Sequence, residues 1–118
     1  MYVDGFLLPV KRADRQVIQN SLAHMQGAFM DAGANRCVDC WGTDVPDGER
    51  TSFPMAVDLQ DGEVVIFGWI EWPDKEARDT GMEAAMKDPR MDAMRNAAFD
   101  SPRMVFGGFT PIVESARE

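Results

Sequence analysis

The feature that most constrains the fold is the almost continuously apolar run VVIFGWI at residues 64–70. A run of this length is typical of a β-strand that is covered on both faces, and it is far too short to cross a bilayer. We therefore expect a strand over Glu63–Trp72 at the centre of a sheet. The other elements are expected to pair with this strand or to pack on it.

The N-terminal third of the chain predicts one strand and one long helix. Tyr2–Pro9 is rich in aromatic and aliphatic residues and ends at a proline, which fits a first strand. Within Lys11–Ala32 the apolar residues recur at steps of four, three and four, and Gly33 follows as a C-terminal glycine. This spacing predicts a helix with one buried stripe, formed by Ile18, Leu22, Met25 and Phe29.

The rest of the chain predicts two further strands and two further helices. Asn35–Thr43 follows a glycine and fits a second strand, and Arg103–Val113 fits the last one. Lys75–Lys87 fits a second helix. Asp88 followed by Pro89 is typical of an N-cap and first position, so a short third helix is expected there.

The order strand, helix, strand, strand, helix, strand predicts an α+β protein with the ferredoxin-like βαββαβ arrangement and an antiparallel sheet. The stretch Thr51–Leu59 has the weakest pattern, although Ser52 is a candidate cap of a short helix. The 118 residues are enough for one core, so a single domain is expected over residues 1–118. Such a sheet carries its helices on one face and leaves the other face uncovered.

The charge balance narrows the range of partners. Twelve Lys and Arg against twenty Asp and Glu give a net charge of −8, which repels nucleic acid and anionic lipid. The N-terminus has no basic segment followed by an apolar run. We therefore expect a cytoplasmic protein with no nucleic-acid or membrane partner.

The alternation of side chains along each strand suggests what the uncovered face carries. Each strand has two sets of side chains, one on each face of the sheet. If the sets that contain only aliphatic residues lie under the helices, the other sets lie on the uncovered face. The expected patch is aromatic and consists of Tyr2, Phe6, Trp41, Phe67 and Trp69. A patch of this kind is too large to face water in a soluble monomer, so we expect a homodimer formed through it.

Three acids, Asp4, Asp39 and Glu71, fall on the same expected face. A carboxylate among aromatic rings must be hydrogen-bonded, paired or shifted in pKa. In one interpretation they are structural, either exposed at strand ends or paired with Arg36, Arg103 or an arginine of a partner. Alternatively, they line a ligand cavity whose walls are Trp41 and Trp69.

The cysteines and the histidine do not form a convincing metal or redox site. Cys37 and Cys40 are three apart in an expected strand, so they point to opposite faces and lie too far apart for a disulfide. A closed zinc site needs more ligands than this pair, and His24 lies off the buried stripe of its helix. We expect structural cysteines, no metal and no cofactor.

Several separated motifs resemble the YbaA-like family of small bacterial proteins of unknown function. They are the opening YVDGFLLPV at residues 2–10, DVP at 44–46 followed by TSFP at 51–54, WI at 69–70, DPR at 88–90 and RMVFGGF at 103–109. The resemblance implies the dimeric α/β-barrel superfamily, in which two ferredoxin-like sheets pack face to face around a cavity. It supplies no established catalytic residues.

Other members of that superfamily include cofactor-independent monooxygenases, haem-degrading enzymes, lactone isomerases and small-ligand sensors, so the fold does not choose a chemistry. Binding of a small apolar or aromatic molecule in the barrel is the favoured function. One alternative is a cofactor-independent monooxygenase or isomerase with Asp4, Asp39 or Glu71 as proton acceptor. Another is a purely structural homodimer whose interface is filled by side chains.

Overall fold

The protein is described by a computed structural model over residues 1–96 and 98–117. Four antiparallel strands form one sheet in the order β2-β3-β1-β4. They are β1 (Tyr2–Lys11), β2 (Arg36–Trp41), β3 (Glu63–Trp72) and β4 (Val105–Phe109). This is the ferredoxin-like order, and the longest apolar run forms an inner strand as the sequence predicts.

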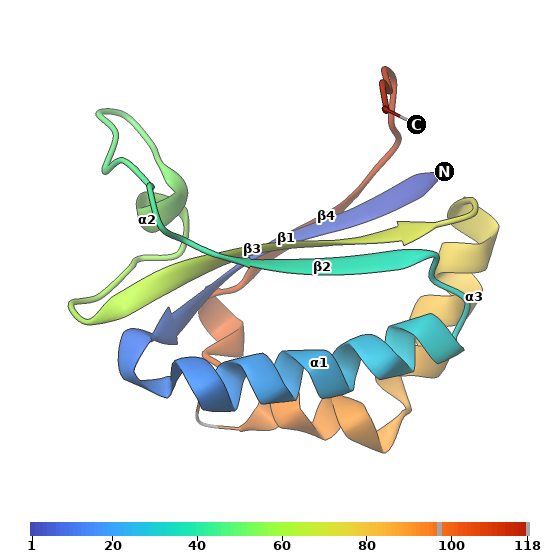
Figure 1. Cartoon of the computed structure of the whole chain (residues 1–118), viewed down its shortest axis with the longest axis horizontal. Helices are drawn as coiled ribbons and strands as arrows, with labels where there is room; N and C mark the ends of the chain where they lie inside the picture. The colour runs from blue at the N-terminus through green and yellow to red at the C-terminus, as the bar shows by residue number, and fades with distance from the viewer. Residues whose placement is uncertain (97, 118) are drawn as a thin grey trace.

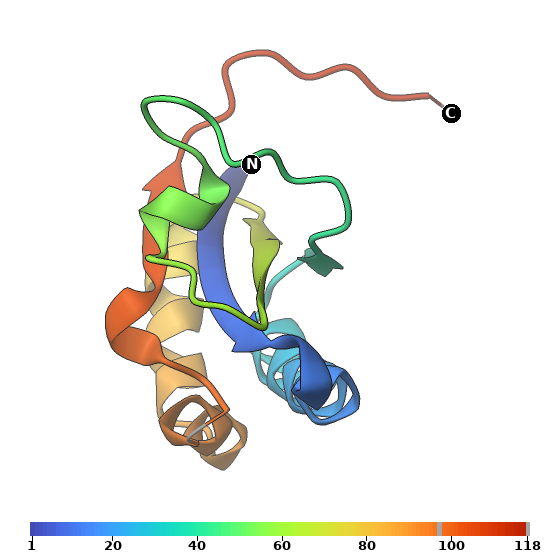
Figure 2. The same cartoon turned by 90° about the vertical axis from the view of Figure 1, so that its left-hand side faces the viewer.

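The main helices lie on one face of the sheet, while a single short helix lies on the other (Figure 1). The helix-covered face packs against α1 (Arg15–Asp31), α3 (Lys75–Met86) and the 3-10 segment η2 (Pro89–Arg95). Figure 2 shows α1 and η2 side by side beneath the strands. The remaining elements are α2 (Phe53–Ala56) on the opposite face and the 3-10 turns η1 (Arg12–Asp14) and η3 (Ser101–Arg103).

The local signals for helix ends are confirmed. Gly33 follows α1 with φ +113°, a conformation that favours glycine. Ser52 accepts a hydrogen bond from the backbone N–H of Met55, and Asp88 accepts one from that of Arg90. The largest differences from the expected boundaries are that the long helix begins with a separate 3-10 turn and that the last strand is confined to Val105–Phe109. The other boundaries agree to within two residues.

The core lies between the helices and the sheet. The predicted stripe of α1 faces it: Ile18 and Met25 are buried, and Leu22 and Phe29 pack against the same cluster. A second cluster surrounds Trp72, whose side chain has no exposed surface. Burial of these side chains is the main source of stability for a domain of this size.

The expected assignment of faces is wrong for the first two strands. Tyr2, Asp4, Phe6 and Leu8 of β1 lie on the helix-covered face, because Leu8 is buried in the core opposite Ile66. Asp39 and Trp41 of β2 lie on the same face, in register with Gly68 and Ile66 of β3. The alternation along a strand correctly predicts which residues share a face. The assumption that the aliphatic residues lie under the helices is what assigns these residues of β1 and β2 to the wrong face.

The open face of the sheet is nevertheless apolar, with a different set of residues. By register it carries Val3, Leu7, Val38, Phe67, Trp69, Val105 and Phe109. The segment that contains α2 covers one end, where the ring of Phe53 meets that of Phe67 edge-on at 6.0 Å between centroids. Of the residues expected in the aromatic patch, Phe67 and Trp69 are on this face.

Arg103 ties the α2 segment to the sheet. Its guanidinium donates to both carboxylate oxygens of Glu63 at 2.8 and 2.7 Å and to the carbonyl of Asp58 at 2.9 Å. It also donates to Asp100 at 2.7 Å. Arg103 therefore forms structural ion pairs. Its partners are Glu63 and Asp100, whereas the sequence suggested that it pairs with Asp4, Asp39 or Glu71.

Candidate functional site

A cavity of about 450 Å³ lies between the sheet and the helices α1, α3 and η2. This volume is within the range of small-molecule sites. Its lining is mainly apolar and includes six methionine side chains, Met25, Met82, Met86, Met91, Met94 and Met104. Thioether side chains are flexible and polarizable, so such a wall adapts to the shape of what it encloses.

One row of residues crosses the sheet along the cavity. Asp39 on β2 is in register with Gly68 on β3, Gly68 with Phe6 on β1, and Phe6 with Phe106 on β4. All four positions are on the helix-covered face. The row places a carboxyl group at one edge of the sheet and an aromatic ring at the other.

Gly68 leaves room for its two neighbours. A Cβ atom at this position would lie 2.3 Å from Phe6 Cζ and 2.6 Å from Asp39 Oδ1. The tip of the phenyl ring and the carboxylate oxygen therefore both occupy the space above the glycine. Any larger residue at position 68 would displace one of them.

Asp39 is only partly satisfied. Gln26 of α1 donates a hydrogen bond of 2.6 Å from Nε2 to Asp39 Oδ2. Oδ1 is buried and has no hydrogen-bond partner among the described residues. Burial raises the pKa of the Asp39 carboxyl, and the hydrogen bond from Gln26 opposes this rise without cancelling it.

Cys37 borders the same end of the cavity and is half-buried. Burial, reinforced by the nearby Asp39 and Glu71, raises the pKa of its thiol to about 11. A thiol of this kind is protonated at neutral pH and is a poor nucleophile. Its sulfur lies 3.9 Å from Met30 Sδ.

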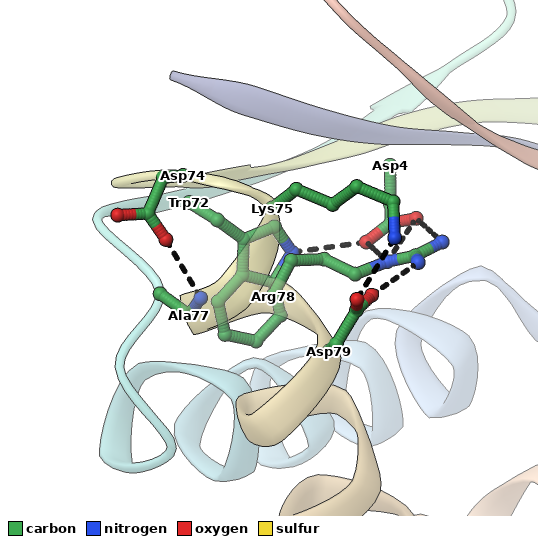
Figure 3. Close-up of polar contacts among 7 residues, drawn as sticks. All are labelled: Asp4, Trp72, Asp74, Lys75, Ala77, Arg78 and Asp79. Atoms are coloured by element: carbon green, nitrogen blue, oxygen red, sulfur yellow. Dashed lines mark hydrogen bonds and ion pairs between the residues drawn. The ribbon is translucent and has the colours of Figure 1, made fainter.

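Asp4 is fully engaged with protein partners (Figure 3). Trp72 donates a hydrogen bond of 2.9 Å from its indole nitrogen to Oδ2. Arg78 of α3 donates from Nε to both oxygens at 3.1 Å and from Nη2 to Oδ1 at 2.8 Å. This bidentate pair neutralises the buried carboxylate and consumes its acceptor capacity.

Arg78 is itself held in place by its neighbours. Its guanidinium lies 5.1 Å from the centroid of the Tyr2 ring and donates a hydrogen bond of 2.9 Å to Asp79. A Cβ at Gly108 of β4 would lie 2.3 Å from Tyr2 Oη and 2.9 Å from Arg78 Nη2. Gly108 therefore allows the side chains of Tyr2 and Arg78 to approach the backbone of β4 closely.

The predicted site residues fall into two groups. Asp4 and Asp39 line the cavity, although from the helix-covered side of the sheet. Trp41 does not line it; its ring packs against the core and lies 4.9 Å from the guanidinium carbon of Arg15. Glu71 does not line it either and lies on the open face. Trp69 is among the lining residues, although its indole nitrogen donates a hydrogen bond of 2.9 Å to Glu71 on the open face.

Sequence reasoning missed Gln26, Gly68 and Arg78. Gly68 had a signal, since a glycine within a central strand often marks a close approach. Gln26 and Arg78 had none, because their partners lie 13 and 74 residues away in the chain. Met25, which the helix spacing predicted to be buried, also borders the cavity.

The remaining residues singled out from the sequence lie outside this cluster. Cys40 is exposed on the open face, opposite in direction to Cys37, as the spacing in a strand predicts. His24 is exposed on α1. Within residues 1–96 and 98–117, no three His, Cys, Asp or Glu side chains gather as a metal site. Across the same residues, none of the helices is long and apolar enough to cross a membrane.

Two solved structures resemble this fold. The structure of Rv0793 from Mycobacterium tuberculosis gives a TM-score of 0.54 at 15% identity, covering 98% of this chain and 100% of that one. An uncharacterized NIPSNAP domain protein from Burkholderia xenovorans gives a TM-score of 0.51 at 14% identity, covering 99% and 100%. At these identities the likeness is one of fold alone.

Comparison of sequences is more specific. Residues 1–101 match a family model described as "Protein of unknown function (DUF1428)". The chain is 42% identical over 114 residues to "Uncharacterized protein YbaA" of Escherichia coli (strain K12), covering 96% of this chain and 97% of that protein. The corresponding protein of Shigella flexneri matches equally well. The chain therefore belongs to the DUF1428 family of YbaA-like proteins, as its motifs indicated.

Proposed function

We propose that this protein binds a small, largely apolar molecule in the cavity between its sheet and its helices. The observation that carries the proposal is the volume of about 450 Å³ that side chains leave unfilled. An apolar wall supplies affinity through burial, and a small number of polar groups orients the ligand. Asp39 and Gln26 are the polar groups at the β2 edge of this cavity.

The exposed lining residues indicate where a ligand would enter. Phe106 of β4 is 75% exposed and Met86 of α3 is 50% exposed, and both line the cavity. They belong to the β4 side of the molecule, where Arg78 also approaches Gly108. Entry between α3 and β4 would bring a ligand over Phe6 toward Asp39.

Fewer candidate proton acceptors remain for the enzyme alternative than the sequence suggested. Asp4 is saturated by Arg78 and Trp72, and Glu71 lies on the other face of the sheet. Asp39 remains the candidate proton acceptor for an oxygenase or isomerase, with a raised pKa that suits general base catalysis. We favour binding, because no activated nucleophile or paired acid accompanies Asp39 among the residues lining the cavity.

We also propose a homodimer in which the open faces of two copies meet, as in a dimeric α/β barrel. Phe109 is 60%, Phe53 46% and Phe67 44% exposed on this face. These three rings alone present on the order of 300 Å² of apolar surface, enough to mark an interaction site. A second copy is the favoured occupant, because an apolar face of this kind is complementary to the same face of another copy.

A cytoplasmic location also remains part of this proposal. It is supported by two cysteines that are free thiols and that lie on opposite faces of one strand. Unpaired cysteines of this kind are typical of reducing compartments.

Titration of isotope-labelled protein with naphthalene, followed by NMR of the backbone amides, tests the binding proposal. We expect saturable shifts at amides that border the cavity. Leu22→Trp, which fills the cavity from α1, should abolish them, while Val17→Trp on the exposed side of the same helix should not. Shifts that persist in Leu22→Trp would mean that the probe binds elsewhere.

A further inference from the structure

Asp39 lies at the β2 end of the cavity, and one of its carboxylate oxygens has no hydrogen-bond partner among the described residues. Its Oδ2 is engaged by Gln26 at 2.6 Å, while Oδ1 is buried beside Gly68 and the tip of Phe6. A buried carboxyl oxygen without a hydrogen bond costs free energy that a suitable donor would recover. The described residues around it supply no such donor.

We infer that the molecule bound in this cavity carries a hydroxyl group, as a phenol or an enol does, and that this hydroxyl donates to Asp39 Oδ1. The inference rests on the proposed function and specifies its ligand class. Asp39 lines the cavity and its χ2 is a broad torsion, so a ligand hydroxyl reaches Oδ1 when the carboxyl turns from Gly68 and the flexible Gln26 side chain follows Oδ2. The apolar part of the ligand then lies over Phe6, against the methionines of α3 and η2.

The direction of the hydrogen bond follows from the contact with Gln26. If Asp39 is ionised, both of its oxygens accept, and the amide of Gln26 donates to Oδ2. If Asp39 is neutral and Gln26 still donates to Oδ2, the proton lies on Oδ1, which would then donate a hydrogen bond and not accept one. A ligand hydroxyl that donates to Oδ1 therefore selects the ionised form of Asp39.

The neighbouring groups do not offer a competing anion or cation site. Cys37 is protonated near neutral pH, since burial raises the pKa of its thiol to about 11. Arg78, the cation that borders the cavity, is occupied by Asp4 and Asp79. A ligand with one neutral hydroxyl therefore fits this end of the cavity better than a carboxylate or a phosphate does.

Three probes of one shape test the inference: naphthalene, 2-naphthol and 2-methoxynaphthalene. All three have the same apolar ring system. Naphthalene has no oxygen, 2-naphthol has a hydroxyl that donates a hydrogen bond, and 2-methoxynaphthalene has an ether oxygen that can only accept one. Calorimetric titration of the full chain should give about tenfold tighter binding of 2-naphthol than of 2-methoxynaphthalene. Asp39→Leu should remove this preference while keeping the affinity for naphthalene, and Asp61→Leu in an exposed turn should retain it.

The outcomes separate the inference from the proposed function. Equal binding of all three probes, or tighter binding of 2-methoxynaphthalene, overturns the hydroxyl inference and leaves cavity binding intact. Binding of none of them to the wild-type chain overturns cavity binding itself. If the amide spectrum shows that Asp39→Leu is unfolded, Asp39→Ala takes its place, and retention of the full tenfold preference there contradicts the role of the carboxyl.

Discussion

The indole nitrogen of Trp72 on β3 donates a hydrogen bond of 2.9 Å to Asp4 Oδ2 on the neighbouring strand β1. Both side chains lie beneath α3, and Arg78 of that helix completes the coordination of the carboxylate (Figure 3). Asp4, which we expected on the uncovered face from the sequence, is thus buried and links the sheet to the helix α3. This link shapes one wall of the cavity and leaves Asp39 as its unsatisfied acid.

Removal of Arg78 should destabilise the fold strongly. Arg78→Met leaves the buried Asp4 carboxylate without its cation, which we expect to lower the free energy of unfolding by about 2 kcal/mol. Urea denaturation measures the change. Lys75→Met removes the exposed pair with Asp79 and should have little effect. Equal losses in the two variants would contradict the structural role of the Asp4–Arg78 pair.

The raised pKa of Asp39 predicts a specific pH dependence of stability. The folded protein holds this proton more tightly than the unfolded chain, whose Asp pKa is about 3.8, so the contribution favours folding at low pH. It is lost as the pH rises from about 3.8 through the higher pKa of the folded state. Asp39→Asn should therefore gain stability relative to wild type as the pH increases.

Urea denaturation of both proteins at several values between pH 4 and pH 7 measures this difference. The other carboxyl groups are common to both chains and cancel in the comparison. Parallel stability curves would mean that Asp39 titrates as an ordinary exposed acid, and the argument for an unsatisfied cavity acid would fail.

Two glycines of the sheet should respond very differently to alanine. A Cβ at Gly68 meets Phe6 and Asp39 at under 3 Å, whereas one at Gly5 meets the Phe109 ring at 3.6 Å, an ordinary contact. Gly68→Ala should cost about 1–3 kcal/mol and weaken probe binding at the Asp39 end. Gly5→Ala should be tolerated in both assays. Similar melting temperatures for the two variants would refute the close packing above Gly68.

Much of the fold was predictable because its signals are local. The bounds of Glu63–Trp72, the buried stripe of α1 and the caps at Ser52 and Asp88 all follow from spacing and neighbours in the chain. These features depend on backbone geometry and on side chains a few residues apart. The sheet order then follows from the order of the elements.

The site was only partly predictable, because choosing a face requires partners distant in sequence. Asp4 is tolerated under α3 since Arg78 neutralises it, and Phe6 is tolerated since Gly68 leaves space for its ring. Neither relationship leaves a periodic pattern in the sequence. The expectation that aromatic and acidic residues face outward therefore failed for β1 and β2, while the simpler aliphatic pattern of β3 was correct.

The open face should hold two copies of the chain together. Light scattering of the wild-type protein at micromolar concentration should give about twice the chain mass. Phe109→Arg, on an edge strand where the ring is already 60% exposed, should produce a folded monomer. Val17→Arg on exposed α1 should leave the dimer intact. A monomeric wild type, or a dimer that survives Phe109→Arg, would contradict association through this face.

The most direct test of cavity binding is a crystal structure of the protein grown with 2-naphthol. We expect electron density for the ring between α1, η2 and the sheet, over Phe6 and against the methionines, with its hydroxyl toward Asp39. A cavity closed by collapsed methionine side chains, with the ring absent or bound only on the open face, would contradict it.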